Sequence, residues 1–178
     1  MQIERTKIDD CFLIKPKFFD DNRGHFFETY RQNVFQKYIG KEIAFVQHSH
    51  SSSKRNVLRG LHYQKTKPQG KLIRVVKGKI FDVAVDIRAS SKSYGKWIGF
   101  YLSDDNSNQF WIPPGFAHGF CVISEVAHIT YRLTDYFDPT DSYAINWNDP
   151  DINIDWPTNK PILSEKDKSA PYFRDIKS

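Results

Sequence analysis

The stretch LIRVVKGKIFDVAVDI, residues Leu72 to Ile87, decides the fold because it is the most apolar part of the chain. Two runs rich in β-branched residues, 72–76 and 80–87, flank the turn triplet Lys77-Gly78-Lys79. This pattern is typical of two strands joined by a tight turn, so we predict a β-hairpin. Within the second run, apolar and more polar residues alternate with the two-residue period of a strand.

Similar runs recur outward from this stretch and predict further strands. They lie at residues 12–14, 18–19, 25–30, 43–46, 97–102, 110–112, 118–123 and 127–133, the last two as a strand pair. One short helix is predicted, capped by Asn33 and ended by Gly40. Beyond Trp147 the composition turns to Asp, Pro and Asn, which predicts a C-terminal tail that wraps the strands. Many strands without βαβ alternation indicate an all-β sandwich or barrel.

The composition narrows the class of protein and partner. The 178 residues are expected to form one domain over residues 1–178, and the 15% aromatic content favours strands around a ligand cleft. A net charge of +5 suits a phosphate-bearing ligand, whereas the interspersed acidic residues argue against a nucleic-acid partner. Small barrels often cover their edge strands in a dimer, so we expect a homodimer.

The cysteines and the N-terminus indicate the compartment. Cys11 and Cys121 are far apart in apolar surroundings and are predicted to be buried free thiols. Residues 1–7 are charged and lack the apolar core of a signal peptide. No apolar run is long enough to span a membrane, so we expect a cytoplasmic protein without a membrane partner.

The residues suited to catalysis lie just before the apolar stretch, in Arg59-Gly60-Leu61-His62-Tyr63-Gln64 and Gln69-Gly70-Lys71. Histidine takes and returns a proton near neutral pH. Lysine stabilises a negative oxygen, and the arginine fork matches phosphate. Together these residue types indicate proton transfer beside a carbonyl on a phosphate-bearing substrate.

Pro113-x-Gly115-x-x-His118 resembles the second motif of the cupin superfamily, whose fold is a jelly-roll barrel. In metal-binding cupins the first motif supplies two histidines one residue apart and later a glutamate. Here the corresponding place contains His62 alone, followed by Lys71. A lysine beside a divalent ion is repelled by it, so we expect no metal; a metal-dependent cupin oxygenase is an alternative.

Over residues 1–170 the sequence resembles one cupin branch, the dTDP-4-dehydrorhamnose 3,5-epimerase family. The matching segments follow in order at residues 21–28, 56–64, 69–74, 81–86, 95–97, 111–120, 147–150 and 163–167. The resemblance implies a cupin-type jelly-roll barrel that inverts C3, C5 or both in a nucleotide-linked 4-keto-6-deoxy sugar. It implies no cofactor, and a place in deoxysugar biosynthesis for surface polysaccharide such as capsule or lipopolysaccharide.

The same resemblance implies roles for individual residues. His62 is the base, Asp167 orients it, Tyr131 is the acid on the opposite face, and Lys71 stabilises the enolate oxygen. The implied substrate-binding residues are Arg23 and Arg59 for the diphosphate, Phe137 for stacking on the nucleotide base, and Glu28, Gln47, His118, Phe120 and Lys166 along the cleft.

Two places depart from the family pattern. Gln47 is followed by His48 and Ser49 where the family has Asp and then Asn or Gln, and Ser142 stands where a glutamate is usual. Both positions are associated with the nucleotide, so the reaction type is retained while the nucleotide stays open. A GDP-linked 4-keto-6-deoxy sugar, such as a heptose, is the alternative substrate. A sugar-nucleotide ketoisomerase and a non-catalytic carbohydrate-binding barrel are the alternative functions.

Overall fold

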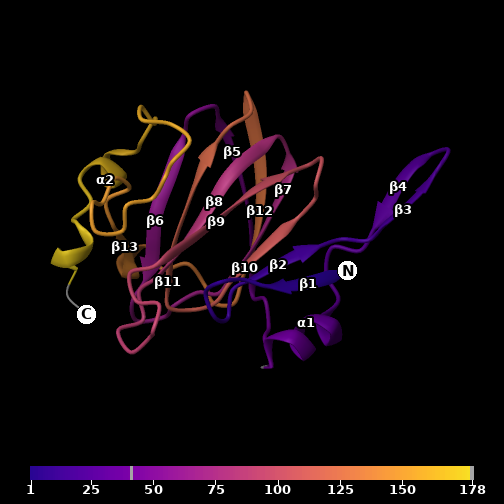
Figure 1. The fold of residues 1–178 in the computed structure, drawn as a ribbon, viewed down its shortest axis with the longest axis horizontal. Coiled ribbons are helices and arrows are strands. Elements are labelled where there is room, and N and C mark those ends of the chain that lie inside the picture. Colours follow the sequence, from indigo (N-terminus) through magenta and orange to yellow (C-terminus); the bar gives the residue numbers. More distant parts are fainter. Residues whose placement is uncertain (41, 177–178) are drawn as a thin grey trace.

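The computed structural model describes residues 1–40 and 42–176, which fold mainly into two antiparallel sheets (Figure 1). The first sheet has the strand order β1 (Gln2–Arg5), β2 (Phe12–Lys15), β10 (Gln109–Ile112), β7 (Lys71–Lys77), β12 (Val126–Leu133) and β5 (Gln47–Lys54). The second has the order β13 (Ser142–Ala144), β6 (Leu58–Gln64), β11 (Phe116–Val122), β8 (Lys79–Asp86) and β9 (Trp97–Ser103). The predicted all-β class is confirmed.

The main core lies between the two sheets, and a second apolar layer covers the outside of the five-stranded sheet. In β8, Ala84 faces the main core, whereas its neighbours Val83 and Val85 face the second layer. Ile152 and Trp156 of the C-terminal segment cover that layer, so β8 is buried on both faces. The predicted alternation and the predicted wrapping tail are both confirmed, and the tail carries the short helix α2 (Glu165–Lys168).

A third apolar layer places the helix α1 (Gln32–Ile39) on the outside of the six-stranded sheet. Phe35 is buried against Trp111, with their ring centres 5.2 Å apart. The residue at the helix N-cap is Arg31, whose side chain forms no capping hydrogen bond, so the predicted cap at Asn33 is wrong. Burial of Phe35 fixes where the helix lies, and a cap contributes only about 1 kcal/mol. Gly40 ends the helix in the left-handed conformation, as predicted.

The predicted hairpin around Lys77-Gly78-Lys79 is wrong, because β7 and β8 belong to different sheets. Gly78 lies at the crossing, and a Cβ atom there would approach the Val126 carbonyl oxygen to 2.2 Å. The predicted pair at 118–123 and 127–133 is wrong in the same way, since β11 and β12 also lie in different sheets. Turn residues specify a local reversal of the chain, whereas burial of both inner faces decides which strands pair.

The predicted strand at 43–46 is also wrong, and the strand lies in the polar run that follows it. Ile43 and Phe45 have no ladder partners and pack into the α1 layer instead. The strand is β5, which pairs with β12 along its whole length, from Gln47 opposite Leu133 to Lys54 opposite Val126. The apolar residues at 43–46 indicated a buried segment, and a loop that packs against a helix can be buried as a strand can.

Strands β3 (Phe18–Asp21) and β4 (Gly24–Phe27) form a separate hairpin that projects away from the two sheets, on the side opposite the C-terminal segment (Figure 1). The strand predicted at 25–30 corresponds to β4, which ends at Phe27 instead of at residue 30. Phe19 is 54% exposed and Phe26 is 70% exposed on this hairpin. Large exposed aromatic surfaces of this kind mark interaction sites.

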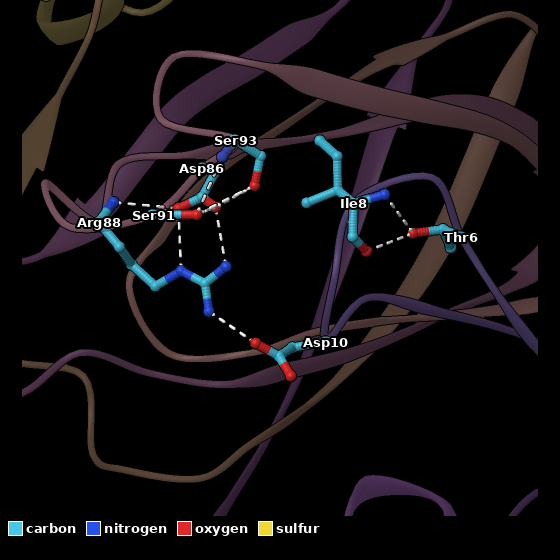
Figure 2. Close-up of polar contacts among 7 residues, drawn as sticks. All are labelled: Thr6, Ile8, Asp10, Asp86, Arg88, Ser91 and Ser93. Carbon is cyan, nitrogen blue, oxygen red and sulfur yellow. Dashed lines mark hydrogen bonds and ion pairs between the residues drawn. The ribbon is translucent and has the colours of Figure 1, made fainter.

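A buried carboxylate fixes the loop after β8 to the loop between β1 and β2. Asp86 accepts hydrogen bonds from the Arg88 guanidinium at 2.8 and 2.9 Å and from the hydroxyls of Ser91 and Ser93, each at 2.6 Å. Arg88 also donates to Asp10 at 2.8 Å (Figure 2). Burial alone would raise the pKa of Asp86, but these donors lower it to about 2. The network thereby links the ends of the two sheets.

Both cysteines are buried free thiols, as predicted. Within the described residues, no helix has the length and apolar character that crossing a membrane requires.

Candidate active site

A pocket of about 300 Å³ lies between the two sheets and is lined from both of them. Its walls include most of the residues that the sequence singled out. These are Arg59 and His62 from β6, Lys71 from β7, His118 and Phe120 from β11, Tyr131 from β12 and Phe137 from the loop after β12. The sequence therefore predicted a set of side chains that the fold brings into one cavity.

His62 and Asp167 form a close pair at the wall provided by β6. His62 Nε2 lies 2.5 Å from Asp167 Oδ1, and the His62 side chain is 38% exposed whereas Asp167 is 2% exposed. Burial works against ionisation of Asp167, but the hydrogen bond from His62 and one from Ser164 hold its pKa below the ordinary value. A carboxylate bound to one ring nitrogen fixes the orientation and tautomer of a histidine, so the other nitrogen can accept a proton.

Two glycines allow the strands that carry the histidines to approach closely. A Cβ atom on Gly60 would lie 2.5 Å from the Cα of Gly119, and Gly60 has a φ of +135°. His62 on β6 is directly opposite His118 on β11 in the ladder. A side chain at either glycine would force these strands apart and separate the two rings.

Lys71 and His118 are coupled through a buried carboxylate, Asp82. His118 Nε2 lies 3.0 and 3.1 Å from the two Asp82 oxygens. Burial lowers the pKa of Lys71 to about 8, and the charge of Asp82 partly opposes this shift. Burial also raises the pKa of Asp82, against the effects of His118 and Lys71. The pocket thus contains an ammonium group in a low-dielectric setting, where its attraction for a negative oxygen is strongest.

Tyr131 reaches the pocket from the opposite sheet to His62. Its ring lies beside Phe120, with ring centres 6.5 Å apart. Its hydroxyl is 2.7 Å from the hydroxyl of Ser51 on β5. Burial raises the pKa of the Tyr131 phenol well above its ordinary value, while Ser51 and Arg59 act in the opposite direction. The phenol therefore keeps its proton at rest, and burial makes release of that proton costlier, a cost that Ser51 and Arg59 partly offset.

The other predicted binding residues lie around this centre. The Gln47 side-chain oxygen accepts a hydrogen bond from the Phe137 backbone N–H at 2.8 Å, so Gln47 supports the Phe137 loop. Lys166 Nζ is 2.8 Å from both the carbonyl and the hydroxyl oxygen of Ser142, which lines the pocket. Phe137 is 53% exposed and lines the pocket, so its ring is accessible to a ligand there.

Arg23 and Glu28 are not brought to this pocket within a single chain. Arg23 lies at the tip of the β3–β4 hairpin and pairs with Asp21. Glu28 follows β4 and pairs with Arg31 at 2.6 Å. Neither side chain lines the pocket.

Sequence reasoning missed two residues that the pocket depends on. Asp82 is completely buried between Lys71 and His118. Its signal was a carboxylate within an otherwise apolar strand, where an unpaired charge is costly. Ser51 hydrogen-bonds to the Tyr131 hydroxyl, and its sequence signal is the polar run after Gln47, which forms β5 with alternately covered and exposed side chains.

The side chains that line the pocket are of types suited to proton transfer. A base with a carboxylate partner, a protonated phenol and a buried ammonium group converge there. In the part of the chain described, no three His, Cys, Asp or Glu side chains are grouped as metal ligands would be.

Comparison with known proteins identifies the family. A model of the dTDP-4-dehydrorhamnose 3,5-epimerase family matches residues 5–175. The chain is 49% identical to the dTDP-4-dehydrorhamnose 3,5-epimerase of Pseudomonas aeruginosa over 98% of this chain and 97% of that protein. It is 50% identical to the Salmonella typhimurium protein of the same description over 97% and 96% of the two chains.

A solved structure agrees with the sequence relatives. The dTDP-6-deoxy-D-glucose-3,5-epimerase of Legionella pneumophila, in complex with dTDP-4-keto-L-rhamnose, is 45% identical with a TM-score of 0.95. The match covers 99% of this chain and 94% of the other. The fold is therefore the predicted cupin-type jelly roll, and the chain belongs to the dTDP-4-dehydrorhamnose 3,5-epimerase family.

Proposed function

We propose that the protein is a dTDP-4-dehydrorhamnose 3,5-epimerase, which inverts C3 and C5 of a dTDP-linked 4-keto-6-deoxyhexose during dTDP-rhamnose biosynthesis. The observation that carries this proposal is the position of His62 and Tyr131 on opposite sheets around one pocket. Inversion needs a base on one face of a carbon and an acid on the other. The Legionella relative, described with dTDP-4-keto-L-rhamnose, supports the choice of nucleotide.

The reaction begins with removal of a hydrogen from a carbon next to the ketone. His62 takes this proton through the ring nitrogen that Asp167 does not engage. The electron pair left on carbon moves into the ketone, and the Lys71 ammonium stabilises the enolate oxygen. Tyr131 then donates its proton to the same carbon from the opposite face, which inverts it. Water in the open pocket then takes the proton from His62 and returns one to Tyr131, which resets the pair for the second carbon and for the next substrate.

The nucleotide part of the substrate lies along the rim of the pocket. Arg59 binds the diphosphate with its planar guanidinium, and Phe137 stacks on the base through its exposed ring. Lys166 and Gln47 position this rim through Ser142 and through the Phe137 loop.

A second copy of the chain completes the site. The β3–β4 hairpin has no strand partner outside itself in the described chain, and it exposes Phe19 and Phe26 on the same hairpin that carries Arg23. An exposed aromatic hairpin that carries nucleotide-binding residues away from its own pocket fits an exchange between two protomers. In this homodimer, Arg23 and Glu28 of one protomer reach the diphosphate and base in the pocket of its partner.

Replacing both exposed aromatics, Phe19→Asp with Phe26→Asp, is expected to give a monomer, because two buried charges would replace the apolar contact. Sedimentation velocity measures the change. Tyr172→Asp is the matched control, because Tyr172 is 45% exposed on the C-terminal segment and lies outside the hairpin. A monomeric wild type, or a double variant that is still dimeric, contradicts the proposed exchange.

Replacing the base, His62→Asn, is expected to slow exchange of solvent deuterium into the sugar by about 10²- to 10⁴-fold. NMR of a dTDP-linked 4-keto-6-deoxyhexose in heavy water follows exchange at C3 and C5 separately, and the GDP-linked sugar is tested beside it. Wild-type exchange rates in the variant would remove His62 from its role. Absence of exchange in the wild type with both sugars would contradict the epimerase, and a shifted carbonyl would identify a ketoisomerase.

The rate of epimerisation is expected to fall as the pH rises above about 8, the pKa to which burial lowers Lys71. The sign follows from the charge, because deprotonation above the pKa removes the cation that stabilises the enolate. In Lys71→Arg this alkaline limb is expected to move upward, since a guanidinium stays charged. The measurement is kcat as a function of pH. A limb at the same pH in both proteins would assign it to another group.

A further inference from the structure

The inner face of β5 supports the pocket with a row of short polar side chains. Along this edge strand the odd-numbered residues are covered and the even-numbered ones are exposed. Three covered residues bond to residues that line the pocket: Gln47 to the Phe137 backbone, Ser51 to Tyr131 and Ser53 to Arg59 at 3.1 Å. The fourth, Ser49, accepts a hydrogen bond from the Gln47 side chain at 3.1 Å. Ser49, His50 and Ser51 also line the pocket themselves, so β5 is part of the wall and supports Tyr131, Arg59 and the Phe137 loop through this row.

The contact between Ser51 and Tyr131 is the shortest in this row, at 2.7 Å between the two hydroxyl oxygens. β5 and β12 are neighbouring antiparallel strands, in which Tyr131 is opposite Ser49, so Ser51 is its diagonal neighbour. Rigid strand pairing therefore holds both oxygens. Within the described residues, Ser51 is the side chain that hydrogen-bonds to the phenol.

The direction of this hydrogen bond follows from the proposed reaction. Tyr131 must point its own hydrogen at a substrate carbon, so it cannot at that moment donate to Ser51. The Ser51 hydroxyl then donates to the phenol oxygen. After the phenol has given up its proton, the same donor stabilises the phenolate, and such charge-assisted hydrogen bonds are the stronger kind. The bond thus strengthens as the proton leaves.

We propose that Ser51 is a positioning residue that aims the Tyr131 proton at the face opposite His62 and stabilises the phenolate that remains. This inference rests on the proposed epimerase function and adds to it the residue that separates inversion from simple exchange. No bond to Ser51 forms or breaks, and its hydroxyl keeps its own proton throughout. The proton given by Tyr131 is replaced from water in the open pocket after each inversion.

The surroundings of the phenol support this role. Burial raises the pKa of Tyr131, and the nearby Asp82 carboxylate acts in the same direction, so forming a phenolate there is unfavourable. The hydrogen bond from Ser51 and the charge of Arg59 lower the pKa. Ser51 therefore offsets part of the cost that burial adds to the proton-donating step.

The test compares inversion with exchange in Ser51→Ala. A dTDP-linked 4-keto-6-deoxyhexose is incubated in heavy water, and NMR measures deuterium in sugar of retained and of inverted configuration. Inversion is expected to fall by about 10- to 100-fold, the effect of one lost charge-assisted hydrogen bond. Deuterium uptake with retained configuration uses His62 and Lys71 but not Tyr131, so it is expected to stay within about twofold of wild type.

Two further variants distinguish positioning from a general structural effect. Ser52→Ala removes a hydroxyl from the exposed face of the same strand and is expected to behave as wild type. Ser51→Thr keeps the hydroxyl on a residue that strands accept and is expected to restore most of the inversion. Circular dichroism and thermal unfolding check that each variant is folded.

Each outcome decides between the explanations. Equal loss of exchange and inversion in Ser51→Ala would assign Ser51 a structural role and overturn the proposal, as would unchanged inversion. Failure of Thr to restore inversion while the variant is folded would also overturn it. Absence of both exchange and inversion in the wild type would instead contradict the epimerase function itself, so the two failures are distinguishable.

Discussion

Inversion of a ring carbon requires two proton-transferring groups on opposite faces of one ring, and the separation of β6 and β12 into facing sheets meets this constraint. His62 enters from the five-stranded sheet and Tyr131 from the six-stranded sheet. The pocket between them is only about 300 Å³. A rigid strand cannot present one side chain to both faces of a sugar. Two facing sheets can place one proton-transferring group on each face.

The charges inside the barrel follow from the same constraint. In the proposed reaction the stabilising cation lies between the two sheets, where burial lowers the pKa of Lys71 to about 8. Asp82 opposes this loss of charge and also binds His118, so one buried carboxylate supports two groups of the pocket. A second buried carboxylate, Asp167 of α2, hydrogen-bonds to His62. The two buried carboxylates are hydrogen-bonded to histidines, and the charge of Asp82 also acts on Lys71.

Motif residues could be predicted from the sequence because their chemistry is local, whereas strand pairing depends on the whole chain. His62, Lys71 and Tyr131 were assigned to one site and lie in one pocket. The turn at Gly78 gave no sign that the chain changes sheets there, because turn residues describe only the reversal. The strand β5 escaped prediction because its covered residues are a glutamine and three serines, polar side chains whose burial depends on hydrogen-bond partners distant in sequence. Arg23 and Glu28 lie outside the pocket of their own chain, which no pattern within one sequence reveals.

The most direct test of this account is a crystal structure of the protein with a bound dTDP-linked 4-keto-6-deoxyhexose. The account predicts the sugar ring between His62 and Tyr131, with one group on each face, and the ketone oxygen within hydrogen-bond reach of Lys71 Nζ. A ring with both groups on the same face, or a ketone oxygen bound to a metal ion instead of the ammonium, would contradict it.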